Sequence, residues 1–198
     1  MDGDRTKSRR VFLGAWLLAP SAAALGAWPR PARGGRLLET PACGDEPTPP
    51  VGAGPFFKPS SPERRTLREP AEEGERIVLT GRVLSAACQP LPGALLDFWH
   101  ADPTGRYDTG GFHLRGHQYA DAEGRFRLET VVPGGYGGRT RHFHVKVQPA
   151  GGRVLTTQLF FPGDPHNATD FLFRPDLLME VQGSAEGRTA RFDFVVAV

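Results

Sequence analysis

Two histidines separated by one residue are the side chains whose type and spacing point most directly to chemistry. They stand in the segment Arg139-Thr140-Arg141-His142-Phe143-His144-Val145-Lys146-Val147. If this segment is a strand, His142 and His144 project from one face, because successive side chains alternate, and the apolar residues pack on the other. Two neighbouring imidazoles on a rigid strand can bind a metal ion, although the same pair also suits a solvated polar face.

Two tyrosines favour the metal interpretation and indicate which metal it is. Tyr136 precedes His142 by six residues, and Tyr107 stands in Gly105-Arg106-Tyr107-Asp108; both segments are glycine-rich and typical of turns. A phenolate is a hard, anionic ligand that suits ferric iron when combined with imidazole, whereas zinc is usually held by His with Cys or a carboxylate. The chain has only two cysteines, far apart in the sequence, so a thiolate-rich site is not expected. The donor set therefore predicts Fe(III).

Strands and tight turns must position these donors. The chain contains 25 glycines and 19 prolines, which favour many turns and short strands. Apolar runs between turn signals predict strands at Arg76–Leu84, Ala94–His100, Gly124–Val132, Arg141–Gln148, Val154–Phe161 and Ala190–Val198. No long amphipathic helix is expected, and Asp176–Val181 is predicted to form a single helical turn. The predicted fold class is all-β, a single β-sandwich domain with an extended Pro/Gly-rich N-terminal arm.

The N-terminal residues have the features of an export signal. Ser8-Arg9-Arg10-Val11-Phe12-Leu13 resembles a twin-arginine signal, and an uncharged, Ala-rich run follows it. A membrane anchor is the alternative, but the run is weakly apolar and is interrupted by Pro20. We therefore expect export to the periplasm or the medium without a stable membrane anchor. The predicted parts are a signal peptide (1–27), a Pro/Gly-rich arm (28–75) and a β-sandwich domain (76–198).

Charge and cysteine content exclude some partners and leave one bridge open. The formal net charge is +2, and residues 1–27 contain four basic and two acidic residues, so the mature chain is neutral. Neutrality gives no electrostatic reason to expect binding to nucleic acid or to an anionic membrane. Export permits a disulfide between Cys43 and Cys88, which would stabilise the fold by about 4 kcal/mol. Two unpaired thiols are the alternative, because the sequence does not reveal the distance between them.

Several short motifs occur in the order found in one enzyme family. Together they resemble the intradiol ring-cleavage dioxygenases, which include catechol 1,2-dioxygenase and protocatechuate 3,4-dioxygenase. Any single motif is weak, but two tyrosines and two histidines in this order and with these flanks make the resemblance specific. The motifs are Gly54-Pro55-Phe56-Phe57, Gly81-Arg82-Val83, Pro90-Leu91-Pro92-Gly93-Ala94, Asp97-Phe98-Trp99-His100-Ala101-Asp102, Gly105-Arg106-Tyr107-Asp108, Arg115-Gly116-His117-Gln118, Asp121-Ala122-Glu123-Gly124, Pro133-Gly134-Gly135-Tyr136, Gly138-Arg139-Thr140-Arg141-His142-Phe143-His144 and Leu155-Thr156-Thr157-Gln158-Leu159-Phe160-Phe161-Pro162-Gly163.

The resemblance implies a non-haem ferric centre with four protein ligands. By motif these are Tyr107, Tyr136, His142 and His144. Tyr136 corresponds to a labile axial phenolate and His144 to the other axial ligand, which leaves Tyr107 and His142 in the equatorial positions. Because the labile tyrosine leaves the metal when substrate binds, Tyr136 is also expected to act as a general base.

Two further residues are assigned by the resemblance alone. Arg139 matches an arginine that stabilises charge on the activated ring, and Gln158 matches a glutamine that lines the same pocket. Position alone would favour a surface ion pair for the first and a satisfied strand amide for the second. The implied reaction cleaves a catechol-type ring between its two hydroxyl-bearing carbons with O2, giving a cis,cis-muconate-type diacid. The implied partners are a small catecholic substrate and O2, and a homo-oligomer is compatible because family members assemble.

The sequence departs from the family pattern at three places and leaves other functions open. Phe143 stands where an aliphatic residue is frequent, Gly137-Gly138 suggest a more open pocket mouth, and Phe56-Phe57 replace a usual tyrosine. The ring substituent of the substrate is left open. An exported non-catalytic β-sandwich binding module, which needs no iron, is one alternative. An iron-dependent phenolic-binding protein is another.

Overall fold

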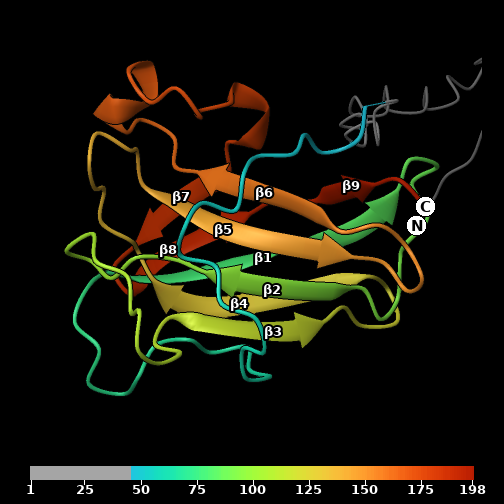
Figure 1. The fold of residues 1–198 in the computed structure, drawn as a ribbon, viewed down its shortest axis with the longest axis horizontal. Coiled ribbons are helices and arrows are strands. Elements are labelled where there is room, and N and C mark those ends of the chain that lie inside the picture. The colour runs from blue at the N-terminus through green and yellow to red at the C-terminus, as the bar shows by residue number, and fades with distance from the viewer. Residues whose placement is uncertain (1–45) are drawn as a thin grey trace, which may run out of the picture. The chain divides into compact units, whose positions relative to one another are not determined.

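The fold is seen in a computed structural model that describes residues 46–198 (Figure 1). The predicted export signal, the first part of the predicted arm and Cys43 lie outside the described residues, so the domain boundaries and the Cys43–Cys88 bridge stay predictions. Within residues 46–198 there is no α-helix, and no helix could cross a membrane. Two short 3-10 helices occur among these residues, η1 (Pro165–Ala168) and η2 (Pro175–Leu177).

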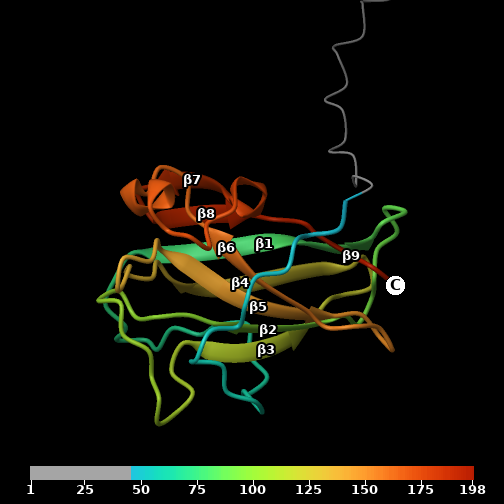
Figure 2. The ribbon, with the colours of Figure 1, turned by 45° about the horizontal axis from the view of Figure 1, so that its top comes forward.

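In the described part of the chain, nine strands form two sheets that lie face to face, as expected for a β-sandwich. One sheet has the order β4-β1-β8-β7, with β9 also paired to β1, and the other has the order β3-β2-β5-β6. Figure 2 shows β1, β7 and β8 of the first sheet in one layer and β2 and β3 of the second in the other. The strands are β1 (Arg76–Ser85), β2 (Leu95–Trp99), β3 (Arg115–Tyr119), β4 (Arg125–Val131), β5 (His142–Gln148), β6 (Leu155–Phe160), β7 (Glu180–Ser184), β8 (Gly187–Arg191) and β9 (Phe194–Val196).

Most predicted strands are confirmed, and the differences have identifiable causes. The predicted single strand Ala190–Val198 is wrong. β8 pairs with the first half of β1 and β9 with its second half, and the two strands are separated by Phe192-Asp193. β3 and β7 were not predicted, because their sequences are polar and lack apolar alternation. The predicted helical turn is shifted, since η2 ends at Leu177 and β7 begins at Glu180.

The core lies between the sheets and fixes which way β5 faces. Phe143, Val145 and Val147 belong to one large apolar cluster and are fully buried. Because side chains alternate along a strand, His142 and His144 point away from this core. The cluster also contains Ile77, Leu79, Val83, Leu96, Phe98, Phe126, Leu128, Leu159, Phe161 and Phe194.

The segment before β1 covers the sandwich without forming a strand of its own. Thr48 N–H donates to Val195 C=O (2.8 Å) and Val51 N–H to Thr156 C=O (2.9 Å), so the chain follows β9 and β6. Residues 62–67 then hydrogen-bond to both His117 of β3 and Glu129 of β4. These strands are edges of different sheets, so the segment shields two edges that would otherwise expose unpaired backbone groups. The cyan-to-green trace in Figure 1 follows this path.

Candidate metal centre

A two-glycine turn presents Tyr136 and Arg139 side by side. It connects β4 to β5, and Arg139 N–H donates to Tyr136 C=O (2.7 Å). Gly137 and Gly138 have φ angles of 52° and 80°, which glycine adopts without steric cost. A Cβ on either would meet no atom within 4 Å, so backbone conformation and not crowding favours glycine. A hollow of about 390 Å³ adjoins the turn and is lined by Gly135–Arg139, Arg141 and Asp164–His166.

Strand β5 holds the two imidazoles with their Nε2 atoms converging. The side chains of His142 and His144 are buried, and their Nε2 atoms lie 3.1 Å apart. Nδ1 of His142 lies 2.6 Å from Thr140 C=O, a contact in which the ring nitrogen must be the donor. In the neutral ring Nε2 then carries a lone pair. Nδ1 of His144 is buried and has no hydrogen-bond partner among the described residues.

A close approach of two loops brings Tyr107 next to Tyr136. In the β2–β3 connection, Gly105 has a φ of 85°, and a Cβ there would lie 2.4 Å from Gly135 C=O. Only glycine therefore allows the two loops to pack at this distance. The rings of Tyr107 and Tyr136 meet edge to face with centroids 5.4 Å apart.

A buried arginine fixes the backbone around Tyr107. Arg115 is 2% exposed and donates through Nη2 to Asp108 C=O (2.8 Å) and through Nη1 to Phe56 C=O (2.6 Å). The Phe56 ring in turn stacks on Tyr107, with centroids 4.3 Å apart and an interplanar angle of 10°. Phe56 thus forms a flat apolar wall behind one candidate ligand.

The donor atoms fit a single hard cation in type and position. Oη of Tyr107 lies 3.1 Å from Nε2 of His144, and that atom lies 3.1 Å from Nε2 of His142. Donors bound at about 2.1 Å from one ion and at right angles to each other would be about 3 Å apart. Residues 46–198 contain no cluster of three or more His, Cys, Asp and Glu that could hold a metal. A metal centre here therefore depends on the phenols.

Burial sets the protonation of these groups in a way that suits a metal. Burial lowers the pKa of His142 to about 4, and burial together with the neighbouring His142 lowers the pKa of His144 well below its usual range. Both rings are therefore neutral at pH 7, as metal ligands must be. Burial and the adjacent Tyr136 raise the pKa of Tyr107 above its usual range. A bound cation would supply the positive charge that ionisation of this phenol requires.

Arg139 and Gln158 are joined to each other on the face of the four-stranded sheet that carries the two imidazoles. Gln158 of β6 stands directly opposite His144 in the β5–β6 ladder. Arg139 Nη2 donates to Gln158 Oε1 (2.5 Å), while Gln158 Nε2 donates to Gly52 C=O (2.9 Å). Arg139 Nε donates to the buried carboxylate of Asp170 (2.8 Å). The guanidinium is thus fixed next to the imidazoles by a carboxylate and an amide.

An aromatic wall orients the second imidazole. Trp99 stands opposite His144 in the β2–β5 ladder, and the two rings stack with centroids 4.8 Å apart and an interplanar angle of 3°. The Trp99 indole is packed edge to face against Phe57 (5.0 Å). This packing restricts rotation of the His144 ring and keeps its Nε2 atom aimed at the other donors.

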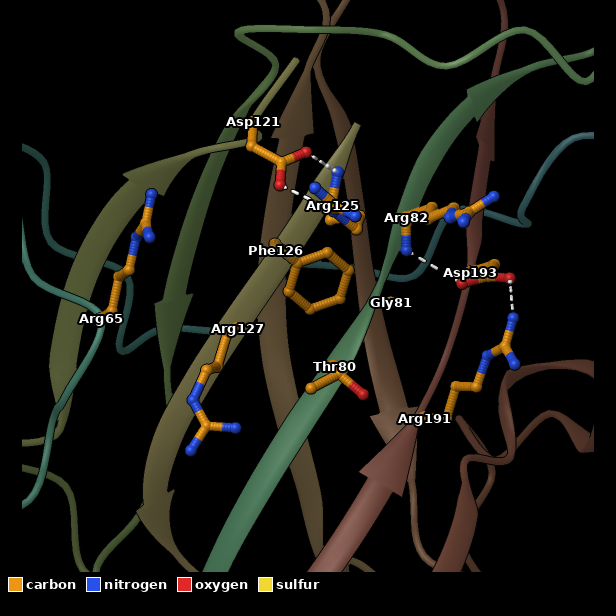
Figure 3. Close-up of a pocket in the computed structure, with 10 residues that line it drawn as sticks. All are labelled: Arg65, Thr80, Gly81, Arg82, Asp121, Arg125, Phe126, Arg127, Arg191 and Asp193. Carbon is orange, nitrogen blue, oxygen red and sulfur yellow. Dashed lines mark hydrogen bonds and ion pairs between the residues drawn. The ribbon is translucent and has the colours of Figure 1, made fainter. Parts of the chain in front are cut away.

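A second hollow lies far from this chemistry, on the outer face of the five-stranded sheet. Its volume is about 450 Å³, and Figure 3 shows arginines around it, with Asp121 pairing Arg125 and Asp193 pairing Arg191. None of the candidate metal ligands lines it. Its lining residues are Arg65, Thr80, Gly81, Arg82, Asp121, Arg125, Phe126, Arg127, Arg191 and Asp193.

Comparison with known proteins identifies the family. A family model described as "Dioxygenase" (Dioxygenase_C) matches residues 53–197, which include all four candidate ligands. The chain belongs to the intradiol ring-cleavage dioxygenase family. Members of this family typically use ferric iron, which agrees with the two-phenol, two-imidazole donor set described above.

Individual relatives support the assignment at different levels of identity. The chain is 32% identical over 162 residues to a catechol 1,2-dioxygenase from Pseudomonas sp. (strain EST1001), covering 67% of this chain and 54% of that protein. It therefore spans about half the length of that curated relative. Among solved structures, the dioxygenase domain of a dioxygenase carbohydrate-binding protein fusion from Streptomyces sp. SirexAA-E is 54% identical, with a TM-score of 0.76 and coverage of 77% of this chain and 99% of that one. A catechol 1,2-dioxygenase from Pseudomonas arvilla C-1 is 30% identical with a TM-score of 0.69, covering 76% of this chain and 62% of that one.

The structure brings together every residue that the sequence assigned to the intradiol dioxygenase centre and adds others. The residues that sequence reasoning missed are Asp170, which holds Arg139, and Arg115, which holds the backbone beside Tyr107. Asp170 is 31 residues from Arg139, and no local pattern connects them. Arg115 lies inside one of the family motifs, so its motif was visible but its burial was not.

Proposed function

We propose that this chain is an Fe(III)-dependent intradiol dioxygenase acting on a catechol-type ring. The observation that carries the proposal is the convergence of Tyr107, His142 and His144. Nε2 of His144 lies 3.1 Å from Nε2 of His142 and 3.1 Å from Oη of Tyr107. In the reaction, the bond between the two hydroxyl-bearing carbons breaks and each carbon gains one oxygen atom of O2. Catechol and O2 are together converted to a cis,cis-muconate-type diacid, and no other reductant or oxidant is consumed.

The protein residues hold the ion and move one proton. Tyr107, Tyr136, His142 and His144 are the ligands, and ferric iron bound to them supplies the Lewis acidity that favours ionisation of the catechol hydroxyls. Tyr136 stands on the two-glycine turn, whose glycines meet no neighbouring atom within 4 Å of an added Cβ. The phenolate oxygen of Tyr136 would accept a proton from a catechol hydroxyl, so one side chain would act as ligand and as general base.

Arg139 and Gln158 act on the charge of the ionised ring. The guanidinium is 13% exposed at its side chain and is oriented by Asp170 and by Gln158 Oε1. A fixed cation in a site from which most water is excluded stabilises developing negative charge far more than it would in water. Gln158, tied at both ends of its amide, serves as a rigid pocket wall that positions the ring.

The substrate class that we propose is a small catechol released from plant material outside the cell. The relative from Streptomyces sp. SirexAA-E is described as part of a fusion with a carbohydrate-binding protein from a cellulolytic bacterium. The twin-arginine-like N-terminus of this chain agrees with export to the periplasm or the medium.

The test is the visible absorption spectrum of the purified, iron-reconstituted protein before and after catechol is added in air. A broad tyrosinate-to-iron band that shifts with catechol and recovers as a muconate-type product accumulates is the expected result. A band that shifts without product, across a panel of substituted catechols, would replace the enzyme by an iron-dependent phenolic-binding protein. A colourless protein that takes up no iron would leave the non-catalytic binding module as the better description.

A further inference from the structure

Three side chains of the segment 164–170 hold the three residues that precede His142. Each holding residue is three positions from the next, so the segment contacts the start of β5 at regular intervals. None of these side chains is among the candidate ligands. The pairs are Asp170 with Arg139, Asn167 with Thr140, and Asp164 with Arg141.

Asp170 makes the most complete set of contacts. Its side chain has no exposed surface. It accepts from Arg139 Nε at both oxygens (3.0 and 2.8 Å), from Thr140 N–H (3.0 Å) and from Leu172 N–H (2.9 Å). Burial alone would raise the pKa of Asp170, but the hydrogen bonds from Leu172, Arg139 and Thr140 hold it below its usual range. A buried, ionised carboxylate with several donors makes a rigid anchor for a guanidinium.

Arg139 requires such an anchor because its own backbone gives little constraint. It ends a turn that contains two glycines with positive φ, and a long arginine side chain has many rotamers to lose. The contact through Nε to Asp170 leaves Nη2 free to donate to Gln158 Oε1. Gln158 faces His144 across the ladder, so this single orientation places the guanidinium beside the metal ligands.

We propose that Asp170 is a positioning residue of this centre, which fixes Arg139 for charge stabilisation without taking part in binding the metal. The inference rests on the proposed function, because the role of Arg139 does. Asp170 acts on turnover by orienting Arg139. In Asp170→Asn the amide keeps one acceptor oxygen for Thr140 N–H, so the backbone that precedes His142 stays in place and the iron content and tyrosinate absorption are expected to be unchanged.

Asp164 supplies a matched control in the same segment. It is also buried, and its carboxylate pairs with Arg141 Nε (2.6 Å). Arg141 lies over the Phe161 ring, and neither Asp164 nor Arg141 is among the metal ligands or contacts Gln158. Asp164→Asn and Asp170→Asn therefore each remove one negative charge from a buried carboxylate that pairs with an arginine. Only the Asp170–Arg139 pair contacts Gln158, which stands opposite His144.

The experiment compares both variants with the wild type, each reconstituted with ferric iron. Iron content, the visible band, the melting temperature, the anaerobic affinity for catechol from the band shift, and kcat are measured. We expect kcat of Asp170→Asn to fall about 100-fold, the scale of losing one oriented charge-stabilising group, with iron content and band unchanged. The melting temperature of Asp164→Asn is expected to fall by about as much as that of Asp170→Asn, while its kcat stays at the wild-type value.

A double-mutant cycle isolates the route through Arg139. If Asp170 acts only by orienting that guanidinium, Asp170→Asn changes kcat by less than about twofold in an Arg139→Met background. An equal loss in both backgrounds would overturn the proposal, as would loss of iron from Asp170→Asn or an equal loss of kcat in Asp164→Asn. Should Asp170→Asn fail to fold, Asp170→Glu retains the charge at a displaced position, and unchanged kcat there would also overturn it. An iron-loaded wild type without turnover would refute the proposed function instead.

Discussion

The two sheets of this sandwich both carry polar side chains on their outward faces, but only one of these faces is covered. On the four-stranded sheet, His142, His144 and Gln158 are at most 3% exposed. On the five-stranded sheet, the side chains of Arg125 and Arg127 are 56% and 53% exposed. The same alternation of apolar and polar residues thus produces a buried chemical site on one side and a solvated arginine-rich surface on the other (Figure 3).

The cover, not the strand pattern, makes the difference. The chain around Gly52 and Phe56 lies over the four-stranded sheet, and the loops that carry Tyr107 and Tyr136 meet there. Removal of water strengthens electrostatic interactions and holds the imidazoles neutral. On the uncovered face, water solvates each guanidinium and nearby carboxylates such as Asp121 pair with it. A polar outward face acquires chemistry only where other segments of the chain exclude water from it.

The largest expected effect is loss of the metal when a ligand on the covered face is removed. His144→Ala should abolish iron binding, the tyrosinate band and turnover, because a ring fixed by Trp99 provides one of three converging donors. Metal analysis of the reconstituted protein checks this. Arg127→Ala, on the uncovered face, is the control and should keep full iron content. Full iron retention in His144→Ala would show that the assignment of ligands is wrong.

The next effect concerns proton transfer without loss of the fold. Tyr136→Phe removes the proposed base, so kcat/KM for catechol should fall by roughly 10²- to 10⁴-fold, the usual contribution of general base catalysis. Stopped-flow mixing with catechol should show slower binding as well. Tyr119→Phe is the matched control, since Tyr119 is 46% exposed and is none of the proposed ligands. Turnover close to wild type in Tyr136→Phe would contradict the role of base.

A buried histidine in the core gives a pH dependence of stability. Burial lowers the pKa of His100 to about 4, although a hydrogen bond with Ala101 opposes this, and its Nε2 contacts Thr130 Oγ1. The unfolded chain takes up a proton near pH 6.5, whereas the folded chain resists it down to about pH 4. The contribution of His100 to the free energy of unfolding is therefore fully present above pH 6.5 and declines by about 3 kcal/mol as the pH falls to 4.

Urea unfolding of the iron-loaded protein at several pH values measures this decline. The His100→Gln variant, which has no titrating group at that position, should show a correspondingly flatter profile over the same range. Parallel profiles for the two proteins would mean that other groups cause the acid sensitivity.

The smallest expected effect lies on the uncovered face. Arg82 stands directly opposite Arg125 in the β1–β4 ladder, and like charges in that position repel. Arg82→Thr should raise stability slightly at low salt, and the gain should vanish at high salt because exposed charges are screened. Denaturation at two salt concentrations, with Arg65→Thr as control, measures it. A loss of iron or turnover in Arg82→Thr would break the contrast between the two faces.

Much of the fold could be predicted from local sequence patterns, and the exceptions are strands whose burial depends on contacts outside the strand itself. Five core strands, β1, β2, β4, β5 and β6, matched their predicted ranges within two residues, because alternation and turn residues mark them clearly. β3 could not be predicted in this way. Its buried residues include Arg115, which donates to Phe56 C=O from 59 positions away in the sequence, and Gln118, which accepts from Arg127 N–H of β4.

The candidate site shows the same division. The residue types and motif order were enough to propose Tyr107, Tyr136, His142 and His144 as ligands of ferric iron. They could not show that Asp170 would hold Arg139, since the two are 31 residues apart and their contact is formed only by the folded loops. A buried ion pair has no periodicity that a sequence pattern could detect.

The sequence by itself determined five of the core strands, the face of β5 from which the histidines project, and the donor types available for a metal. These features depend on alternation and on the chemistry of single residues, which are local properties. Only the tertiary structure decided which outward face is covered, how the glycine-bearing loops bring Tyr107 and Tyr136 together, and which carboxylate orients Arg139. These depend on contacts between segments distant in the sequence, and such contacts form when chain packing removes water from both partners.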